Sequence, residues 1–254
     1  MNTTDNEKDF EDKLPAYISF IYGDLYRNQK KCAARDSKFS CDWRTFFQYG
    51  KLVSSLCSEI KRNDSILQMG LVFGNQIDET VMATGSLSRY DIIDVNEEEV
   101  KRFNDKYLKV YPGMRILHQD AANMKTEEKY DIVICFMLLS MVPSATKAKI
   151  VNKALQCVKS KGKVIFIDWH NPWKMHPLRY LVRMYNRLYH PFVERLWDRQ
   201  ISVYADPKVR ANFNWRKTTY FGGMFQKLVV TRKKQLQESW DDEYDSYAFN
   251  QLQY

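Results

Sequence analysis

Short apolar runs alternate with longer stretches of helical periodicity between residues 63 and 170, and this alternation constrains the fold more than any other feature of the sequence. It is typical of βαβ units, in which helices connect parallel strands. The predicted strands are residues 65–69, 89–95, 114–119, 130–138 and 163–169, and the predicted helices are residues 75–83, 97–107 and 144–158. Residues 218–232 instead contain two strand-like runs that meet at Gly222 and Gly223, which favours a tight antiparallel hairpin.

These elements predict an α/β fold with a mostly parallel, Rossmann-like sheet of seven strands that ends in the antiparallel hairpin. We expect one domain over residues 14–232, flanked by mobile ends. The expected parts are an acidic N-terminus (1–13), a helical cap (14–62), a sheet core (63–170 and 215–232), an inserted helical segment rich in basic and aromatic residues (171–214) and a polar tail (233–254).

The composition excludes several classes of protein. The 254 residues contain no apolar run of about 18 residues and no signal-peptide pattern, so neither a membrane-spanning helix nor secretion is expected. The five cysteines are scattered without a C-x-x-C pair, which excludes a zinc site and indicates reduced thiols. A P-loop nucleotidase is excluded too, because no G-x-x-x-x-G-K-[ST] motif occurs.

Candidate ligand-binding residues follow the first predicted strand, because open α/β sheets bind ligands beyond the carboxyl ends of their strands. Gln68 is followed by Gly70 and Gly74, which are spaced like a degenerate nucleoside-binding loop. The two glycines alone are equally compatible with a simple tight turn.

Carboxylates end the next two strands. Asp94 at the second strand is placed to accept hydrogen bonds from both hydroxyls of a ribose, or to cap the helix that follows. Asp120, followed by Ala121, could accept a hydrogen bond from an adenine amino group. Two acids at successive strand ends favour a nucleoside ligand.

The segment after the fourth and fifth strands supplies further polar candidates. Asp168, His170 and His176 lie within nine residues and could bind a divalent ion such as manganese or iron, or act in acid–base chemistry. The alternative is that the histidines are hydrogen-bonded to the backbone of a loop. Ser140 could contact a substrate, but the pattern favours the simpler alternative that Ser144 caps the helix that follows.

Positive charge is concentrated in one region. Of the net charge of +8, residues 171–220 contribute 10 − 3 = +7. Within them, Arg179, Arg183 and Arg187 flank an apolar helical face that we predict to consist of Leu178, Leu181, Val182, Tyr185, Leu188, Tyr189 and Phe192. Such a helix fits an anionic membrane surface, or else packs on the sheet as an ordinary surface helix. No nucleic-acid-binding motif accompanies it, so nucleic acid is not an expected partner.

The sheet layout resembles that of class I S-adenosylmethionine-dependent methyltransferases, and the motifs resemble the rhodoquinone-biosynthesis proteins of the RquA type, which are related to them. The resemblance covers about residues 14–232. Its most specific parts are residues 14–17, 67–74, 93–95, 118–121, 168–179 and 217–227. One departure is Ser140-Met141, where the family usually has His followed by an acid.

The resemblance implies replacement of a methoxy group of ubiquinone by an amino group, giving rhodoquinone, with S-adenosylmethionine as amino donor and Mn²⁺ as metal. The residues implied as catalytic are Tyr17, Asp120, His170 and Tyr220, those implied for the cofactor are Gln68, Gly70, Gly74, Asp94, Asp120 and Ala121, and those implied for the metal are Asp120, His170 and His176.

Two alternative functions remain beside amination. One is an ordinary methyltransferase acting on a quinone or another lipophilic phenol, and the other is a non-catalytic lipid- or protein-binding module. Under the main hypothesis the expected partners are ubiquinone and an anionic membrane surface, while the sequence leaves the oligomeric state open. The expected location is the cytoplasm at the inner membrane, or the matrix side of the mitochondrial membrane in a eukaryote.

Overall fold

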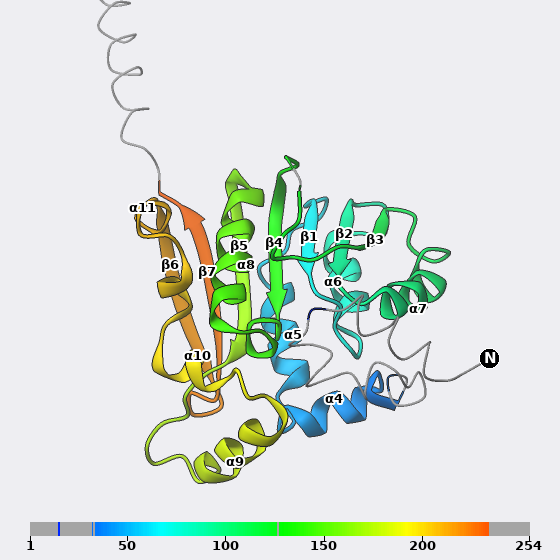
Figure 1. Ribbon diagram of the computed structural model, residues 1–254. Helices are drawn as coiled ribbons and strands as arrows, with labels where there is room; N and C mark the ends of the chain where they lie inside the picture. The colour runs from blue at the N-terminus through cyan, green and yellow to red at the C-terminus, as the bar shows by residue number, and fades with distance from the viewer. Residues whose placement is uncertain (1–14, 16–31, 33, 126, 234–254) are drawn as a thin grey trace, which may run out of the picture.

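The computed structural model describes residues 15, 32, 34–125 and 127–233 and contains a seven-stranded sheet in the order β3-β2-β1-β4-β5-β7-β6 (Figure 1). The first five strands are parallel, and β7 runs antiparallel between β5 and β6. The strands are β1 (Ile66–Met69), β2 (Tyr90–Asp94), β3 (Met114–His118), β4 (Tyr130–Phe136), β5 (Val158–Trp169), β6 (Phe213–Tyr220) and β7 (Phe225–Arg232). The predicted fold is confirmed, including the C-terminal hairpin.

Helices cover both faces of the sheet, which explains why its central strands are apolar on both sides. Successive residues of β1 point to opposite faces: Ile66 joins a core with α5, α6 and α7, whereas Leu67 joins a second core with α8 and the inserted segment. The helices are α4 (Lys38–Arg44), α5 (Tyr49–Cys57), α6 (Gln76–Thr84), α7 (Glu97–Tyr107), α8 (Ser144–Cys157), α9 (Arg179–Tyr189), α10 (Glu194–Asp198) and α11 (Pro207–Arg210), with 3₁₀ turns at Leu139–Met141 and Ile201–Tyr204.

The expected cap is represented by α4 and α5, which lie at the end of the molecule that also holds α9 (Figure 1). Residues 14, 16–31 and 33 of the predicted cap lie outside the described residues, as do both predicted mobile ends apart from Lys233. Among the described residues, no helix is both long and apolar enough to traverse a bilayer.

The apolar residues predicted to share a face of α9 lie in different environments. Val182 and Asn186 are the buried residues of this helix, whereas Leu181, Leu188 and Tyr189 are exposed. Helical periodicity identifies which side chains share a face, but it does not say whether a neighbouring element covers that face. Much of the apolar surface of α9 therefore faces outward.

Candidate functional site

The loop between β1 and α6 begins the site, and its two glycines have backbone conformations that other residues adopt only with strain. Gly70 and Gly74 have φ angles of 89° and 92°. A Cβ atom at Gly70 would lie 3.2 Å from Leu138, and one at Gly74 would lie 2.6 Å from the hydroxyl of Tyr49. The glycines therefore keep the backbone close to its neighbours on both sides.

Asp94 lies at the carboxyl end of β2 and joins this loop. Its Oδ2 accepts a hydrogen bond from the backbone N–H of Leu71 at 2.7 Å, and its Oδ1 accepts one from Asn96 at 2.8 Å. Burial raises the pKa of Asp94 to about 6, because the two N–H groups offset only part of the cost of desolvating the charge. The cap of α7 is Asn96, whose side chain accepts from Glu98 and Glu99, so Asp94 is not that cap.

A hollow at the carboxyl ends of β1, β2 and β3 is lined by Gly70, Asp94, Asp120 and Ala121, together with Leu138 from the loop after β4. Four of the six predicted cofactor residues therefore line one hollow. Asp120 accepts hydrogen bonds from Ala122 N at 2.8 Å and from the Asn123 side chain at 2.6 Å, which fixes its carboxylate at the rim.

The other two predicted cofactor residues lie beside the hollow rather than in its lining. Gln68 is fully buried and is held by Tyr90 and by Gln76, whose Nε2 donates to Gln68 Oε1 at 3.0 Å. Its own amide donates to Gly70 O at 3.1 Å, so Gln68 supports the loop from beneath. Gly74 donates its backbone N–H to a carboxylate that the sequence did not indicate.

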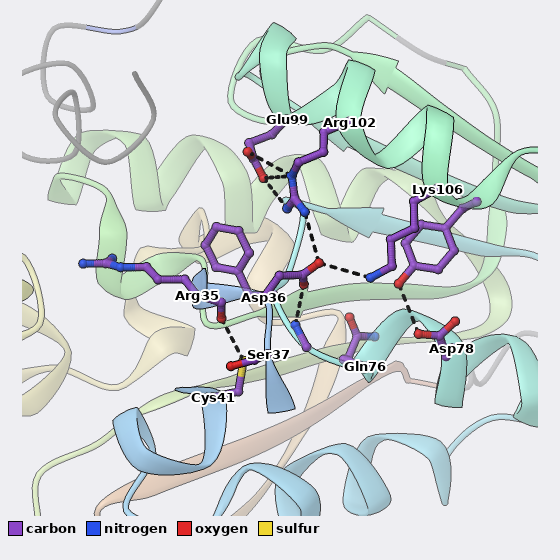
Figure 2. Close-up of polar contacts among 12 residues, drawn as sticks. Arg35, Asp36, Ser37, Cys41, Gln76, Asp78, Glu99, Arg102 and Lys106 are labelled. Carbon is purple, nitrogen blue, oxygen red and sulfur yellow. Dashed lines mark hydrogen bonds and ion pairs between the residues drawn. The ribbon is translucent and has the colours of Figure 1, made fainter. Parts of the chain in front are cut away.

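That carboxylate belongs to Asp36, which connects the segment before α4 to the loop and to α7 (Figure 2). Asp36 Oδ1 accepts from Gly74 N at 2.8 Å, and Oδ2 pairs with Arg102 and Lys106, each at 3.1 Å. These partners are 38, 66 and 70 residues away in sequence, so local patterns do not reveal the contact. Asp36 thus links the segment before α4 to the loop between β1 and α6 and to α7.

A second, larger hollow lies under α4 and continues the first through shared walls. Leu71, Phe136, Met137 and Met141 line both this pocket and an intermediate hollow that also contains Gly70 and Asp94. The pocket is predominantly apolar, with polar groups at a few positions. Its remaining lining residues are Arg35, Cys41, Arg44, Thr45, Tyr49, Val72, Phe73, Ser140, Trp169 and His190.

His190, directly after α9, brings a titratable group to this pocket. Its ring lies 6.2 Å from that of Trp169 between centroids. Burial and then the positive charges of Arg44 and Arg35 lower the pKa of His190 to about 4, so the imidazole is neutral at neutral pH. Sequence reasoning missed His190, Arg35 and Arg44, because nothing in their local spacing marks them as neighbours.

Asp168 has a structural position behind the pocket. It is fully buried, and its carboxylate accepts hydrogen bonds from the backbone N–H groups of Ser140 at 3.1 Å and Trp169 at 2.8 Å. Burial raises its pKa to about 6. Asp168 thereby holds the turn at Leu139–Met141 that forms one wall of the pocket, and Ser140 lines that wall.

The predicted catalytic residues near the C-terminal hairpin do not line these hollows. His170 contacts Gly223 O through Nδ1 and Lys217 Nζ through Nε2, each at 2.7 Å. Tyr220 forms a hydrogen bond with Ser55, and His176 packs edge-on against Phe221 with centroids 5.2 Å apart. His176 was predicted only as a metal ligand. Of the other two residues predicted as catalytic, Asp120 lines the first hollow and Tyr17 lies outside the described residues.

The ligand set expected for manganese does not fit the structure. Across the part of the chain that the structure describes, no group of three or more His, Cys, Asp or Glu side chains is arranged to hold a metal ion. Asp120 lies at the strand ends, whereas His170 and His176 flank the turn between β6 and β7. The bond between His170 and Lys217 also puts an ammonium group where a cation would bind.

The strand order and the two connected hollows define the fold of class I methyltransferases. Residues 66–162 match the family model described as a methyltransferase domain. This range contains β1 to β4 and α6 to α8 and the start of β5, and thus the whole cofactor-side hollow. No curated protein matches the sequence at a significant level.

Solved structures support the same fold at low sequence identity. An O-methyltransferase family protein from Burkholderia thailandensis has a TM-score of 0.60 and 10% identity, covering 91% of this chain and 70% of that chain. Magnesium protoporphyrin IX methyltransferase from Synechocystis PCC 6803, solved with S-adenosylmethionine, has a TM-score of 0.56 and 16% identity, covering 87% and 98%. N-methyltransferase NodS from Bradyrhizobium japonicum WM9, solved with S-adenosylhomocysteine, has a TM-score of 0.54 and 13% identity, covering 84% and 96%.

Proposed function

We propose that this protein is an S-adenosylmethionine-dependent transferase that modifies a lipophilic aromatic acceptor. The observation that carries the proposal is the continuity of two different hollows. One is lined by carboxylates at the ends of adjacent parallel strands, where this fold binds nucleosides, and the other is apolar and lies under α4.

The residues of the first hollow fit the cofactor. The carboxylate of Asp94 suits the two ribose hydroxyls, Asp120 and Ala121 suit the adenine, and the absence of a side chain at Gly70 leaves room for the methionine portion. When bound, S-adenosylmethionine supplies a methyl group on a positively charged sulfur, which an acceptor oxygen can attack.

The residues of the second hollow can orient such an acceptor. Its apolar walls exclude water, and the aromatic ring of Trp169 offers a face for a planar ligand. The positive charges of Arg35 and Arg44 favour ionisation of a phenolic hydroxyl, and neutral His190 can accept a hydrogen bond from that hydroxyl before it loses its proton. The geometry therefore supports methyl transfer to oxygen on a lipophilic phenol.

Calorimetry with S-adenosylmethionine tests the first half of this proposal. The second half is tested by incubating the protein with methyl-labelled cofactor and a panel of lipophilic phenols, followed by mass spectrometry of the products. We expect binding and a product that carries the labelled methyl group. No cofactor binding would overturn the proposal, and binding without methyl transfer to any phenol would overturn its reaction.

One observation favours a second candidate, the conversion of ubiquinone to rhodoquinone by amination. Gln68 lies beneath the loop at Gly70 and carries no charge, and its amide is engaged with Tyr90, Gln76 and Gly70. A neutral side chain there does not favour the protonated form of a nearby amine, and an unprotonated amine is the form that can attack a ring carbon bearing methoxy. Manganese has no part in this candidate, because the residues expected to hold it do not converge.

The two reactions differ in which atom leaves the cofactor. Incubation of a short-chain ubiquinone with S-adenosylmethionine that carries nitrogen-15 at its amino group distinguishes them. A quinone that has lost a methoxy group and gained the labelled nitrogen would support amination. A product that has gained a methyl group, or that carries no labelled nitrogen, would contradict it.

A further inference from the structure

Helix α4 and the turn that follows it expose an aromatic stripe on the side opposite the pocket. Phe39, Trp43 and Phe47 follow one another at intervals of four residues and are 73%, 64% and 63% exposed. Cys41 and Thr45, on the other side, are buried and line the pocket. One side of this segment therefore forms the pocket wall, while the other presents large aromatic groups to the surroundings.

Helix α9 has a similar arrangement at the same end of the molecule (Figure 1). Val182 is buried, whereas Leu181, Met184 and Leu188 are 48%, 58% and 69% exposed. The ring of Tyr185 on α9 meets that of Phe46 after α4 edge-on, with centroids 6.2 Å apart, which joins the two helices. We call the six exposed side chains Phe39, Trp43, Phe47, Leu181, Met184 and Leu188 the α4–α9 surface.

The charge of α9 and of the loop before it is entirely positive. No acidic residue occurs between Asp168 and Glu194, while Lys174, Arg183 and Arg187 lie in this stretch and are exposed. Not every basic residue of the positively charged region 171–220 contributes, because α11 lies at the opposite end of the sheet (Figure 1) and Arg216 pairs with Glu59 at 3.2 Å. The positive charge next to the exposed apolar groups is thus a local feature of α9 and the loop before it.

From this combination we infer that the α4–α9 surface docks on an anionic lipid bilayer. Aromatic and aliphatic side chains enter the interface between headgroups and acyl chains, and flanking arginines and lysines meet lipid phosphates. The charge complementarity and the spread of the apolar groups over two separate helices fit a deformable, anionic sheet of lipid better than a second folded protein.

Docking in this orientation has a consequence for the substrate. Arg44 and Thr45 at the end of α4 and His190 directly after α9 line the acceptor pocket, so the pocket is bounded by the two docking helices. An acceptor dissolved in the bilayer would then lie next to the helices that bound the pocket. This inference deepens the proposed function by naming the phase from which the acceptor comes, yet vesicle binding is measured without catalysis.

The test is flotation of the whole protein with vesicles of phosphatidylcholine, with or without phosphatidylglycerol. We expect binding to the anionic vesicles, weakened when salt rises from about 0.1 M to about 1 M. The variant Trp43→Ser/Leu188→Ser removes apolar anchors, and Lys174→Gln/Arg187→Gln removes two charges. Each should lower the partition coefficient about tenfold or more.

Matched controls make the same chemical changes at the opposite end of the sheet. Met82→Ser/Leu87→Ser removes two exposed apolar groups, and Lys161→Gln/Lys208→Gln removes two exposed charges. Both should bind vesicles like the unaltered protein. Cofactor binding by calorimetry, retained in all four variants, shows that the fold and the proposed function are intact.

Three outcomes would overturn the inference. The first is equal binding to neutral and anionic vesicles, and the second is equal loss in the control variants. The third is a dimer of the unaltered protein that is lost in Trp43→Ser/Leu188→Ser while no vesicles are bound, which would assign the surface to a second copy of the chain. Failure of cofactor binding in the unaltered protein would contradict the proposed function and leave the vesicle result to stand by itself.

Discussion

The two connected hollows, which together we call the cleft, are built in different ways: the first is the half proposed for the cofactor, and the larger second one is the half proposed for the acceptor. The cofactor half is formed by residues at the ends of parallel strands, Gly70, Asp94 and Asp120, whose positions follow from the topology of the sheet. The acceptor half is formed by the cap and by the residue after α9, Arg44 and His190, which only tertiary packing brings together. The first half is therefore a property of the fold, and the second is a property of this chain.

Replacement of Asp94 by alanine tests the cofactor half and should have the largest effect. Two hydrogen bonds from ribose hydroxyls to a carboxylate would be lost, and we expect affinity for S-adenosylmethionine to fall by about 100-fold or more. Calorimetry measures this directly. The control is Asp105→Ala, an exposed carboxylate on α7, which should bind normally. Normal binding by Asp94→Ala would show that the cofactor lies elsewhere.

Cofactor affinity should depend on pH. Because the pKa of Asp94 is raised to about 6, its carboxylate is ionised above that pH and is protonated as the pH falls through it. Cofactor affinity should therefore decrease about tenfold between pH 7 and pH 5, in calorimetric titrations across this range. An affinity that is independent of pH would contradict ribose binding by an ionised Asp94.

The contribution of Asp94 to folding stability should change with pH in the opposite direction to cofactor affinity. A raised pKa means that the folded chain holds the proton more tightly than the unfolded chain does, so the contribution of Asp94 to stability is present below the unfolded pKa and is lost as pH rises through about 6. Asp168, with a raised pKa of about 6 for the same reason, adds to this loss. It lies outside the cofactor hollow, so it should leave the pH dependence of affinity unchanged.

The sequence predicted the sheet, the hairpin and the cofactor half because their signals are local. Strand periodicity, glycines after a strand and an acid such as Asp94 at a strand end can all be recognised within a few residues. The family resemblance implied catalytic roles for His170 and Tyr220, but side-chain packing directs them to Lys217 and Ser55 instead. His190 gave no signal, since its role depends on α4 lying against it.

Replacement of His190 tests the acceptor half separately. His190→Phe keeps an aromatic ring in the pocket but removes the hydrogen-bond acceptor, so we expect kcat/KM for a phenolic acceptor to fall about fivefold to tenfold with unchanged cofactor affinity. Steady-state kinetics measures kcat/KM, and calorimetry on the same sample measures cofactor affinity. His176→Gln, which alters a histidine packed on Phe221, is the control and should leave both values unchanged. If His190→Phe lowered cofactor affinity as much as kcat/KM, the cofactor half and the acceptor half would not be independent.

The smallest effect on cofactor affinity is expected at Asp36, which links the segment before α4 to the loop after β1 and to α7. Asp36→Asn keeps an oxygen for Gly74 N–H but removes the charge that pairs with Arg102 and Lys106. Because these contacts are only partly exposed to solvent, their loss should cost about 1 kcal/mol of stability and increase hydrogen exchange in residues 34–44. Asp105→Asn is the matched control. If hydrogen exchange rises equally across β1 and β2, Asp36 stabilises the whole domain. If exchange rises in the cap alone, the cap moves as a unit on a sheet that stays formed. Cofactor affinity should then fall only about threefold, because Gly70 and Asp94 keep their positions.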